Sequence, residues 1–539
     1  MTSNSSDSSS SVHHFSAGMA PGLSEAVATA VLSRFNSLPK TGKPTAGEYT
    51  LLAGFAVSDE ATPDVPPRVV ALGTGTKCLP AASRCSRGEA LSDSHAEVLA
   101  RRALKHFLYD EMERVLEGNT EEVEGTDAPP EPIVTLSSDD ASHNNDKNQK
   151  TTNHAAFALR PGVNLHMYVT QSPCGDASIF NIHKGQGNTQ SSNGDTEDND
   201  DKPNENPKYA LSGVDALNES IENPLKKSKR AKTVGVTNLG IGATGAKMIV
   251  TGTDTRNGDN TYDLTLNAPT NTPAVDKEHL VTRQELSVCR VKPGRGALTN
   301  CMSCSDKLCR WISCGVQGGL LSRLIESPVC IATITVACPE QCADGGDVTR
   351  NAENRHNVLR ALGRALTRGG LGDETDRASS GPSLHLSPPP PFFLSSTSGQ
   401  TKGLVSASCS VNWVYRWNKH GEIKTEVTLG ATGKKSGYSK KSENSQKAVS
   451  RLSRLSLARR FVKVVGKVGV VETSIVESNN VQTDTSETNC PTSTPTTTTY
   501  GWLKKAAVEY VSKTNAFREK NTFQSWSVKN EKEKQFCLY

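Results

Sequence analysis

The sequence predicts an α/β fold, because segments typical of strands alternate with segments of helical periodicity. Two early segments, 49–57 and 68–73, have the apolar character of strands. From Ser92 to Leu108, apolar residues recur at the three- and four-residue spacing of a helix. The β-branched run 329–337 predicts a further, buried strand far downstream.

The other elements follow in chain order. A helix is expected at 23–35, and a short strand is expected at 165–170. The segment 304–314 predicts a helix, and 318–325 either continues that helix or begins another.

Composition indicates that this core is interrupted. Only 35% of the 539 residues are hydrophobic and 5% are aromatic, which is low for a fully packed chain. We therefore expect an N-terminal tail and helix over 1–44 and one domain over 45–539. Disordered polar insertions are expected in that domain at about 118–155, 184–280, 340–402 and 472–499.

Charge and cysteine content exclude some classes of protein. A formal net charge of +4 is mildly basic and does not by itself indicate a nucleic-acid partner. The Ser-rich start lacks the apolar segment of a signal peptide, so the 14 cysteines are more typical of free thiols or metal ligands than of disulfides. No run of about 18 apolar residues occurs, so no membrane span is expected.

Three short motifs predict a catalytic zinc site. His95 and Glu97 lie two residues apart at the start of a helix, so His95 can bind a metal while Glu97 reaches a metal-activated water. Cys174 follows the strand at 165–170, and Cys304 begins a later helix. Three protein ligands leave the fourth position of zinc open, which a catalytic site requires. Cys301 is a rival for the third ligand, since it forms C-x-x-C with Cys304.

Other interpretations of these motifs compete with a catalytic site. Taken alone, an H-x-E motif is usually an ordinary helix start. Cys301 and Cys304 could also form a structural zinc site with Cys338 and Cys342. The occurrence of all three motifs, each in a suitable local context, favours catalysis. In a base deaminase built on this site, Glu97 takes a proton from the water that attacks C6 of adenine, and inosine is the product.

Longer blocks surround these residues. They are LGTGTKC (72–78), DSHAEVLARRALKHFLY (93–109), SPCGDASIF (172–180) and MSCSDKLCRW (302–311). They resemble the adenosine deaminase domain shared by the double-stranded-RNA-editing enzymes and the tRNA-specific adenosine deaminases. The resemblance implies a three-layer, cytidine-deaminase-like α/β core with C-terminal additions. It also implies zinc on His95, Cys174 and Cys304, with Glu97 as the proton shuttle.

Two features favour the tRNA branch of this family. Only about 45 residues precede the resemblance, too few for a double-stranded-RNA-binding module. The stretch RVKPGRG (290–296) also resembles the tRNA enzymes. The implied substrate is the adenosine immediately 3′ of the anticodon in tRNA-Ala. Editing of double-stranded or messenger RNA, and an inactive zinc-holding RNA-binding protein, are the alternatives. The oligomeric state is open, with a monomer plausible.

The resemblance also assigns substrate contacts and a second cofactor. Thr76 and Lys77 match positions that contact the target nucleotide, and Ser178 replaces an arginine of the editing enzymes. The cofactor is a buried inositol hexakisphosphate, a polyanion that needs many basic partners. The matching positions are Arg101, Arg102, Lys307, Arg310, Trp311, Gln317, Lys434, Tyr500, Lys504, Tyr510, Trp526 and Lys529. Thr514 stands where the family has a basic residue.

Two basic segments have no assigned role. The run Lys226 to Lys232 could be a nuclear localisation signal, an RNA-binding patch or a solvated basic run, and location in the nucleus or cytoplasm is expected. The segment 450–461 carries several arginines with helical periodicity. It is expected to be an amphipathic surface helix, with contact to tRNA phosphates as the alternative.

Overall fold

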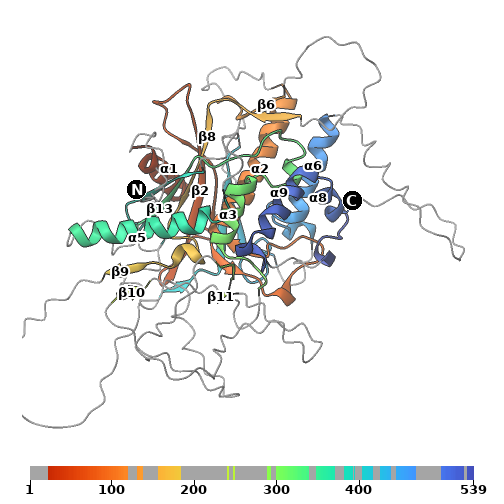
Figure 1. Cartoon of the computed structure of the whole chain (residues 1–539). Coiled ribbons are helices and arrows are strands. Elements are labelled where there is room, and N and C mark those ends of the chain that lie inside the picture. Colours follow the sequence, from red (N-terminus) through yellow and green to blue (C-terminus); the bar gives the residue numbers. More distant parts are fainter. Residues whose placement is uncertain are drawn as a thin grey trace, which may run out of the picture.

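The computed structural model describes residues 22–118, 130–137, 156–183, 239–241, 247–248, 288–292, 299–338, 348–370, 381–391, 394, 404–416, 425–438, 445–468, 499–526 and 531–538. Its centre is a seven-stranded sheet in the order β14-β13-β8-β2-β3-β16-β17 (Figure 1). The strands are β2 (Leu52–Asp59), β3 (Arg68–Thr74), β8 (Val163–Val169), β13 (Thr333–Ala337), β14 (Ser383–Ser387), β16 (Cys409–Val414) and β17 (Thr425–Leu429).

The sheet is mixed. Strands β8, β13 and β14 are parallel to one another, while β2 pairs antiparallel with both β8 and β3. Strands β3, β16 and β17 continue in antiparallel pairs. The expected α/β fold is confirmed, with strands drawn from both halves of the chain.

Helices cover both faces of the sheet because the central strands are apolar on both sides. Leu52 and Ala56 of β2 pack in the cluster that contains α1 (Gly22–Ser37). Their neighbours Ala53 and Phe55 face the cluster that contains α2 (Ala96–Leu116). This alternation follows from the two-residue repeat of a strand. The result is a helix–sheet–helix arrangement.

Helix α2 lies very close to the sheet. A Cβ added at Gly73 on β3 would come within 2.6 Å of the Leu99 Cβ, so the absent side chain permits this approach. The closeness matters because α2 begins directly after His95.

The prediction of disorder is wrong for part of one expected insertion. The range 340–402 contains α5 (Val348–Thr367) and β14, which forms one edge of the sheet. Along α5, Val358, Leu362 and Leu366 recur every fourth residue and are buried. That apolar stripe orders the helix against the core.

Two of the other expected insertions, 118–155 and 184–280, include strands that form short pairs. Strand β6 (Val134–Leu136) pairs with β7 (Phe157–Leu159). Strand β9 (Asn181–His183) pairs with β10 (Leu239–Ile241), and β11 (Lys247–Met248) pairs with β12 (Arg290–Val291). The strand expected at 329–337 is shorter and begins at Thr333.

The remaining elements complete the described part of the chain. The helices are α3 (Cys304–Cys314), α4 (Gly318–Leu321), α6 (Arg454–Val468), α8 (Tyr500–Lys505) and α9 (Val508–Glu519). Short strands are β1 (Glu48–Tyr49) with β15 (Val405–Ser406), and β4 (Thr76–Cys78) with β5 (Asp93–His95). Among the described residues, no helix is both long and apolar enough to cross a bilayer.

Candidate active site

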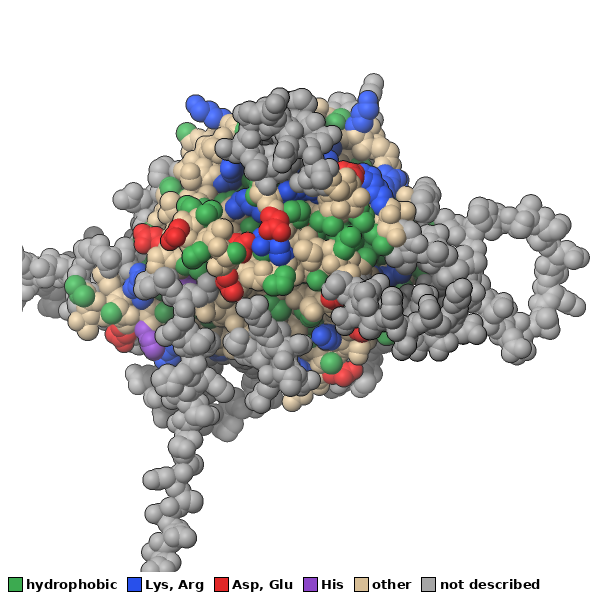
Figure 2. Space-filling model, turned by 90° about the horizontal axis from the view of Figure 1, so that it is seen from above, with side chains coloured by type: hydrophobic (Ala, Val, Ile, Leu, Met, Phe, Trp, Pro, Cys, Tyr) green, Lys and Arg blue, Asp and Glu red, His purple; other side chains and the backbone are tan. Residues whose placement is uncertain are grey.

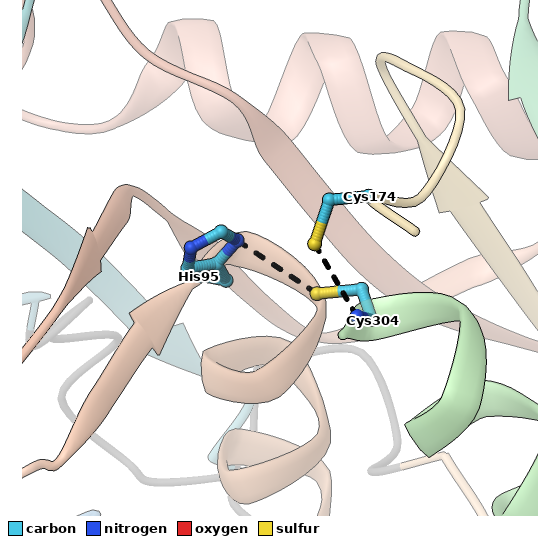
Figure 3. Close-up of side chains that lie close together, drawn as sticks. All are labelled: His95, Cys174 and Cys304. Carbon is cyan, nitrogen blue, oxygen red and sulfur yellow. Dashed lines mark hydrogen bonds between the residues drawn. The ribbon is translucent and has the colours of Figure 1, made fainter. Parts of the chain in front are cut away.

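Three segments converge beyond the C-terminal end of β8, a strand inside the sheet. His95 ends β5 and precedes α2, Cys174 lies in the turn after β8, and Cys304 is the first residue of α3. One ligand atom from each lies within 4.8 Å of the others. The His95 Nδ1 is 3.8 Å from the Cys304 Sγ, and the Cys304 backbone N–H donates to the Cys174 Sγ at 3.3 Å (Figure 3).

Local contacts hold the two cysteine segments together. The Ser303 side chain caps α3 by accepting from the Asp306 N–H. Gly175 has φ +107°, and a Cβ there would overlap the Ser303 Oγ. The Ser305 N–H donates to the Cys174 carbonyl at 3.0 Å. Glycine is therefore required directly after Cys174 if the turn is to lie against α3.

Glu97 lies in the first turn of α2 and is 2% exposed. Its Oε2 is buried and has no hydrogen-bond partner among the described residues. Its negative charge acts on both Cys304 and Lys292, so the carboxylate is close to the three-residue set. A buried acceptor without a donor is costly, so such an atom points to a bound group.

A buried chain of charges extends from Cys304. Lys292 donates to the Cys304 Sγ at 3.0 Å and to both carboxylate oxygens of Asp93, at 3.0 and 3.2 Å. Lys307 forms a second ion pair with Asp93. Burial alone would lower the pKa of Lys292, but Asp93 and Cys304 raise it well above its usual value. Lys292 therefore stays protonated beside the thiol.

Sequence reasoning named Lys307 only as a cofactor residue and did not identify Lys292 or Asp93 as partners. The sequence offers only their distance along the chain from the proposed ligands. Asp93 lies two residues before His95, and Lys292 lies 12 residues before Cys304. Neither spacing indicates a contact without the tertiary structure.

The rival cysteine belongs to a different group. The Cys301 Sγ lies with Cys78 and Asp93, and the Arg84 Nη2 donates to it at 3.0 Å. Among the described residues, the possible metal-holding group containing His95 includes Cys304 and not Cys301. Cys338 follows β13 and joins neither group, and Cys342 lies outside the described residues.

The predicted substrate residues lie beside this site. Strand β4 pairs with β5 so that Thr76 faces His95 and Lys77 faces Ser94. Ser178 is buried, and its hydroxyl donates to the Pro173 carbonyl at 2.8 Å. That hydroxyl therefore stabilises the turn that carries Cys174.

A second group of charges comes from α2, α3 and α8, and its side chains are partly buried. It consists of Arg101, Arg102, Lys105, Arg310 and Lys504, here called the basic cluster. Burial lowers the pKa of Arg101 to about 10. Burial also lowers the pKa of Lys105 well below its usual value, and the surrounding charges of Arg101, Arg102 and Lys504 add to the effect.

Aromatic side chains line the basic cluster. Arg101 lies 4.8 Å from the centre of the Trp311 ring, and Arg310 lies 4.9 Å from that of Trp526. Tyr500 and Tyr510 lie close enough to Arg101 for their phenol groups to affect its pKa. The Arg310 Nε and Trp311 Nε1 are buried without an acceptor among the described residues.

The remaining predicted cofactor positions behave differently. Lys307 is paired with Asp93, while the Gln317 side chain accepts from the Val329 N–H at 3.0 Å and donates to Ser322. Lys434 is buried in the turn after β17. Lys529 lies outside the described residues. Lys105 was missed, because one lysine in a helix gives no local sign of its surroundings.

The arginines of the 450–461 segment form ion pairs and hydrogen bonds within the protein. Arg460 pairs with Asp110, and the Arg459 Nε donates to the Leu538 carbonyl at 3.2 Å. The expected amphipathic helix is confirmed as α6, whose Leu457 and Phe461 are buried. The run Lys226 to Lys232 lies outside the described residues.

The surface charges indicate a function less clearly than the residues of the interior do. Figure 2 shows Lys and Arg side chains interspersed with Asp, Glu and apolar side chains on one face. Surfaces that bind nucleic acid are recognised by clustered basic residues. The charges visible on this face therefore do not by themselves mark RNA-contact residues.

The family model of the adenosine-deaminase (editase) domain matches this chain over residues 71–530. The chain belongs to this family. The match spans the candidate metal site, Glu97 and the basic cluster. The reaction class is therefore adenosine deamination, as the sequence resemblance predicted.

Individual relatives differ in how much of the chain they match. A Drosophila melanogaster protein named tRNA-specific adenosine deaminase 1 is 30% identical over 316 residues, covering 58% of this chain and 55% of that protein. A Mus musculus protein of the same name is 26% identical over 544 residues, covering 91% and 94%. The Drosophila melanogaster double-stranded RNA-specific editase Adar is 25% identical over 311 residues, covering 57% and 32%.

Proposed function

We propose that this protein is a zinc-dependent tRNA adenosine deaminase that converts adenosine to inosine by hydrolysis. The observation that carries the proposal is the grouping of His95, Cys174 and Cys304 beside a buried, unpaired Glu97 oxygen. One imidazole and two thiols suit zinc and leave a coordination position open. When bound, zinc supplies a Lewis acid that lowers the pKa of water toward neutrality.

Glu97 is the proton-transfer group of this proposal. Its free Oε2 accepts the proton of the water that attacks C6 of adenine. It delivers that proton to the ring nitrogen, then takes the second proton from the new C6 hydroxyl and passes it to the amino group that leaves as ammonia. Lys292, held by Asp93, stabilises negative charge on the Cys304 sulfur throughout.

The tRNA substrate is supported by the relatives. The mouse protein covers nearly the whole of this chain and is named a tRNA-specific enzyme, whereas the editase match covers about a third of that protein. We propose the adenosine immediately 3′ of the anticodon, in tRNA-Ala, as the target. Thr76 and Lys77, beside His95 and Ser94 in the β4–β5 pair, are the proposed contacts to the target nucleotide.

We also propose that inositol hexakisphosphate binds at the basic cluster. Buried cations need an opposite charge nearby. The neighbouring charges that shift the pKa of Lys105 are all positive. The unpaired Arg310 Nε and Trp311 Nε1 require acceptors that phosphate oxygens supply. Lys105 joins the residues that would hold the ligand. When bound, the polyanion would neutralise the interior charge and stabilise the fold.

The decisive experiment is inosine mapping. Purified protein is incubated with total tRNA, and inosines are located by sequencing. Inosine is expected 3′ of the anticodon, and Glu97→Gln should keep its zinc while turnover falls by about 10²–10⁴-fold. A wild-type protein with bound zinc that deaminates an RNA duplex and leaves tRNA unchanged would refute the tRNA assignment and favour the editing alternative.

A further inference from the structure

Each cysteine of the candidate metal site is followed, two residues later, by a buried aspartate. Asp176 follows Cys174 and Asp306 follows Cys304, and each is 0% exposed. A carboxylate that is fully removed from water requires paired cations and hydrogen bonds. The partners of these two carboxylates therefore affect how the two cysteine segments lie.

One arginine joins both carboxylates. Arg368 directly follows α5, and its side chain is 5% exposed. Its Nη1 lies 3.3 Å from the Asp176 Oδ2, and its Nη2 pairs with the Asp306 Oδ1. A single planar guanidinium thus connects the turn carrying Cys174 to the helix that begins at Cys304.

A second arginine, one turn earlier, holds the turn itself. The Arg364 Nε lies 3.2 Å from the Asp176 Oδ2. Its Nη2 donates to the carbonyls of Asp176 and Ile179, at 2.9 Å each. These contacts fix the backbone of the 3₁₀ helix η2 (Asp176–Ser178), which follows Cys174.

The helix that carries these arginines is anchored independently of the site. Val358 and Leu362 of α5 are 0% exposed in the main core cluster. Figure 1 shows the end of α5 beside α3. The arginines thus extend from a rigid support to both segments.

We propose that Arg368 and Arg364 are positioning residues that set the separation of Cys174 and Cys304 for the metal. The inference rests on the proposed zinc site and assigns a role to α5 that the reaction chemistry does not require. Partners that orient metal ligands typically contribute 10–100-fold in metal affinity. The Arg290 Nη1 also lies 3.7 Å from Asp176, and the backbone N–H of Arg290 donates to the Asp306 Oδ2 at 3.0 Å. The carboxylates therefore keep a partner when Arg368 is changed.

The test compares Arg368→Gln with Arg360→Gln in the full chain. Arg360 lies on the same helix and is exposed, which makes it a matched control. Zinc affinity is measured by competition with a colorimetric chelator, and folding is measured by circular dichroism. Cobalt is then exchanged into the site, because its thiolate charge-transfer absorption reports the geometry of the two cysteines.

We expect Arg368→Gln to remain folded, to bind zinc about 10–100-fold more weakly and to shift the cobalt–thiolate bands, with Arg368→Lys intermediate. Arg360→Gln should match the wild type. A folded Arg368→Gln with wild-type zinc affinity and cobalt spectrum would overturn the proposal.

If Arg368→Gln does not fold, Arg364→Gln decides the matter, because that side chain is 27% exposed and Arg368 remains on Asp176. Unchanged zinc affinity in Arg364→Gln would then overturn the proposal. Failure of the proposed metal site is separate, since the wild-type protein would then bind no zinc.

Discussion

Single residues at the site are kept in states that cost stability. The Glu97 Oε2 is buried without a donor among the described residues, and Lys292 is a fully buried cation. An apolar side chain at either position would avoid the cost of removing a charged group from water. Proteins retain such groups where function needs them. The cost therefore marks the same residues that the chemistry requires.

The metal assignment can be tested at this scale by two cysteine substitutions. Cys174→Ala should remove one of three ligands and abolish tight zinc binding. Cys338→Ala should keep a full equivalent of zinc, because Cys338 belongs to neither ligand group. Zinc is measured in the purified proteins by atomic emission. Zinc loss in Cys338→Ala with retention in Cys174→Ala would favour the structural four-cysteine site.

At the scale of elements, helix starts and a strand end bring the functional groups together near the end of β8. The candidate ligands sit where chain direction changes: before α2, after β8 and at the start of α3. Helix α5 differs, since it carries no ligand and holds the neighbouring carboxylates. Its order depends on one apolar stripe in the main core, so the placement of its arginines is coupled to the packing of that core.

Shortening a buried side chain of that stripe tests the coupling. Leu362→Ala should lower the free energy of unfolding by about 2–5 kcal/mol, because Leu362 is fully buried. Leu359→Ala on the same helix should cost less, since Leu359 is only half-buried. Chemical denaturation gives both values. Equal, small losses would show that α5 does not belong to the cooperative core.

For the whole molecule, the basic cluster connects distant parts of the chain. Helices α2, α3 and α8 supply its cations, and their residues are separated by some four hundred positions, from Arg101 to Lys504. Like charges held together destabilise the ligand-free fold. A bound polyanion would convert that repulsion into attraction, so the helices that meet here should depend on it.

Lys105→Met tests this dependence through pH and ligand. The pKa of Lys105 in the folded protein lies below its ordinary 10.5, so below that pH the unfolded chain binds more protons. The stability of the ligand-free wild type should therefore rise with pH in that window. The variant should lack this part of the slope, be more stable at neutral pH and gain less from inositol hexakisphosphate.

Thermal unfolding after phytase treatment, with and without added ligand, measures these effects. Lys505→Met is the control, because Lys505 is exposed on the same helix as Lys504. An equal gain from inositol hexakisphosphate in Lys105→Met and in the wild type would remove Lys105 from the binding site.

Local sequence determined the elements and the chemical types at the site. His95 and Glu97 at a helix start, Cys174 after a strand and the helix beginning at Cys304 are all visible within a few residues, because periodicity and turn chemistry act over that range. Residue patterns alone left Cys301 open as a ligand. Its position beside Cys78 depends on contacts across more than two hundred residues.

Only the tertiary structure decided which charges meet. Lys292 on Asp93, Lys105 among cations and Arg368 across two aspartates join segments that no local pattern relates. Helix α5 was missed because its polar composition outweighed a sparse apolar stripe, and that stripe gains stability only when the core is present to cover it. The sequence thus specified the reacting groups, whereas long-range packing determined their partners.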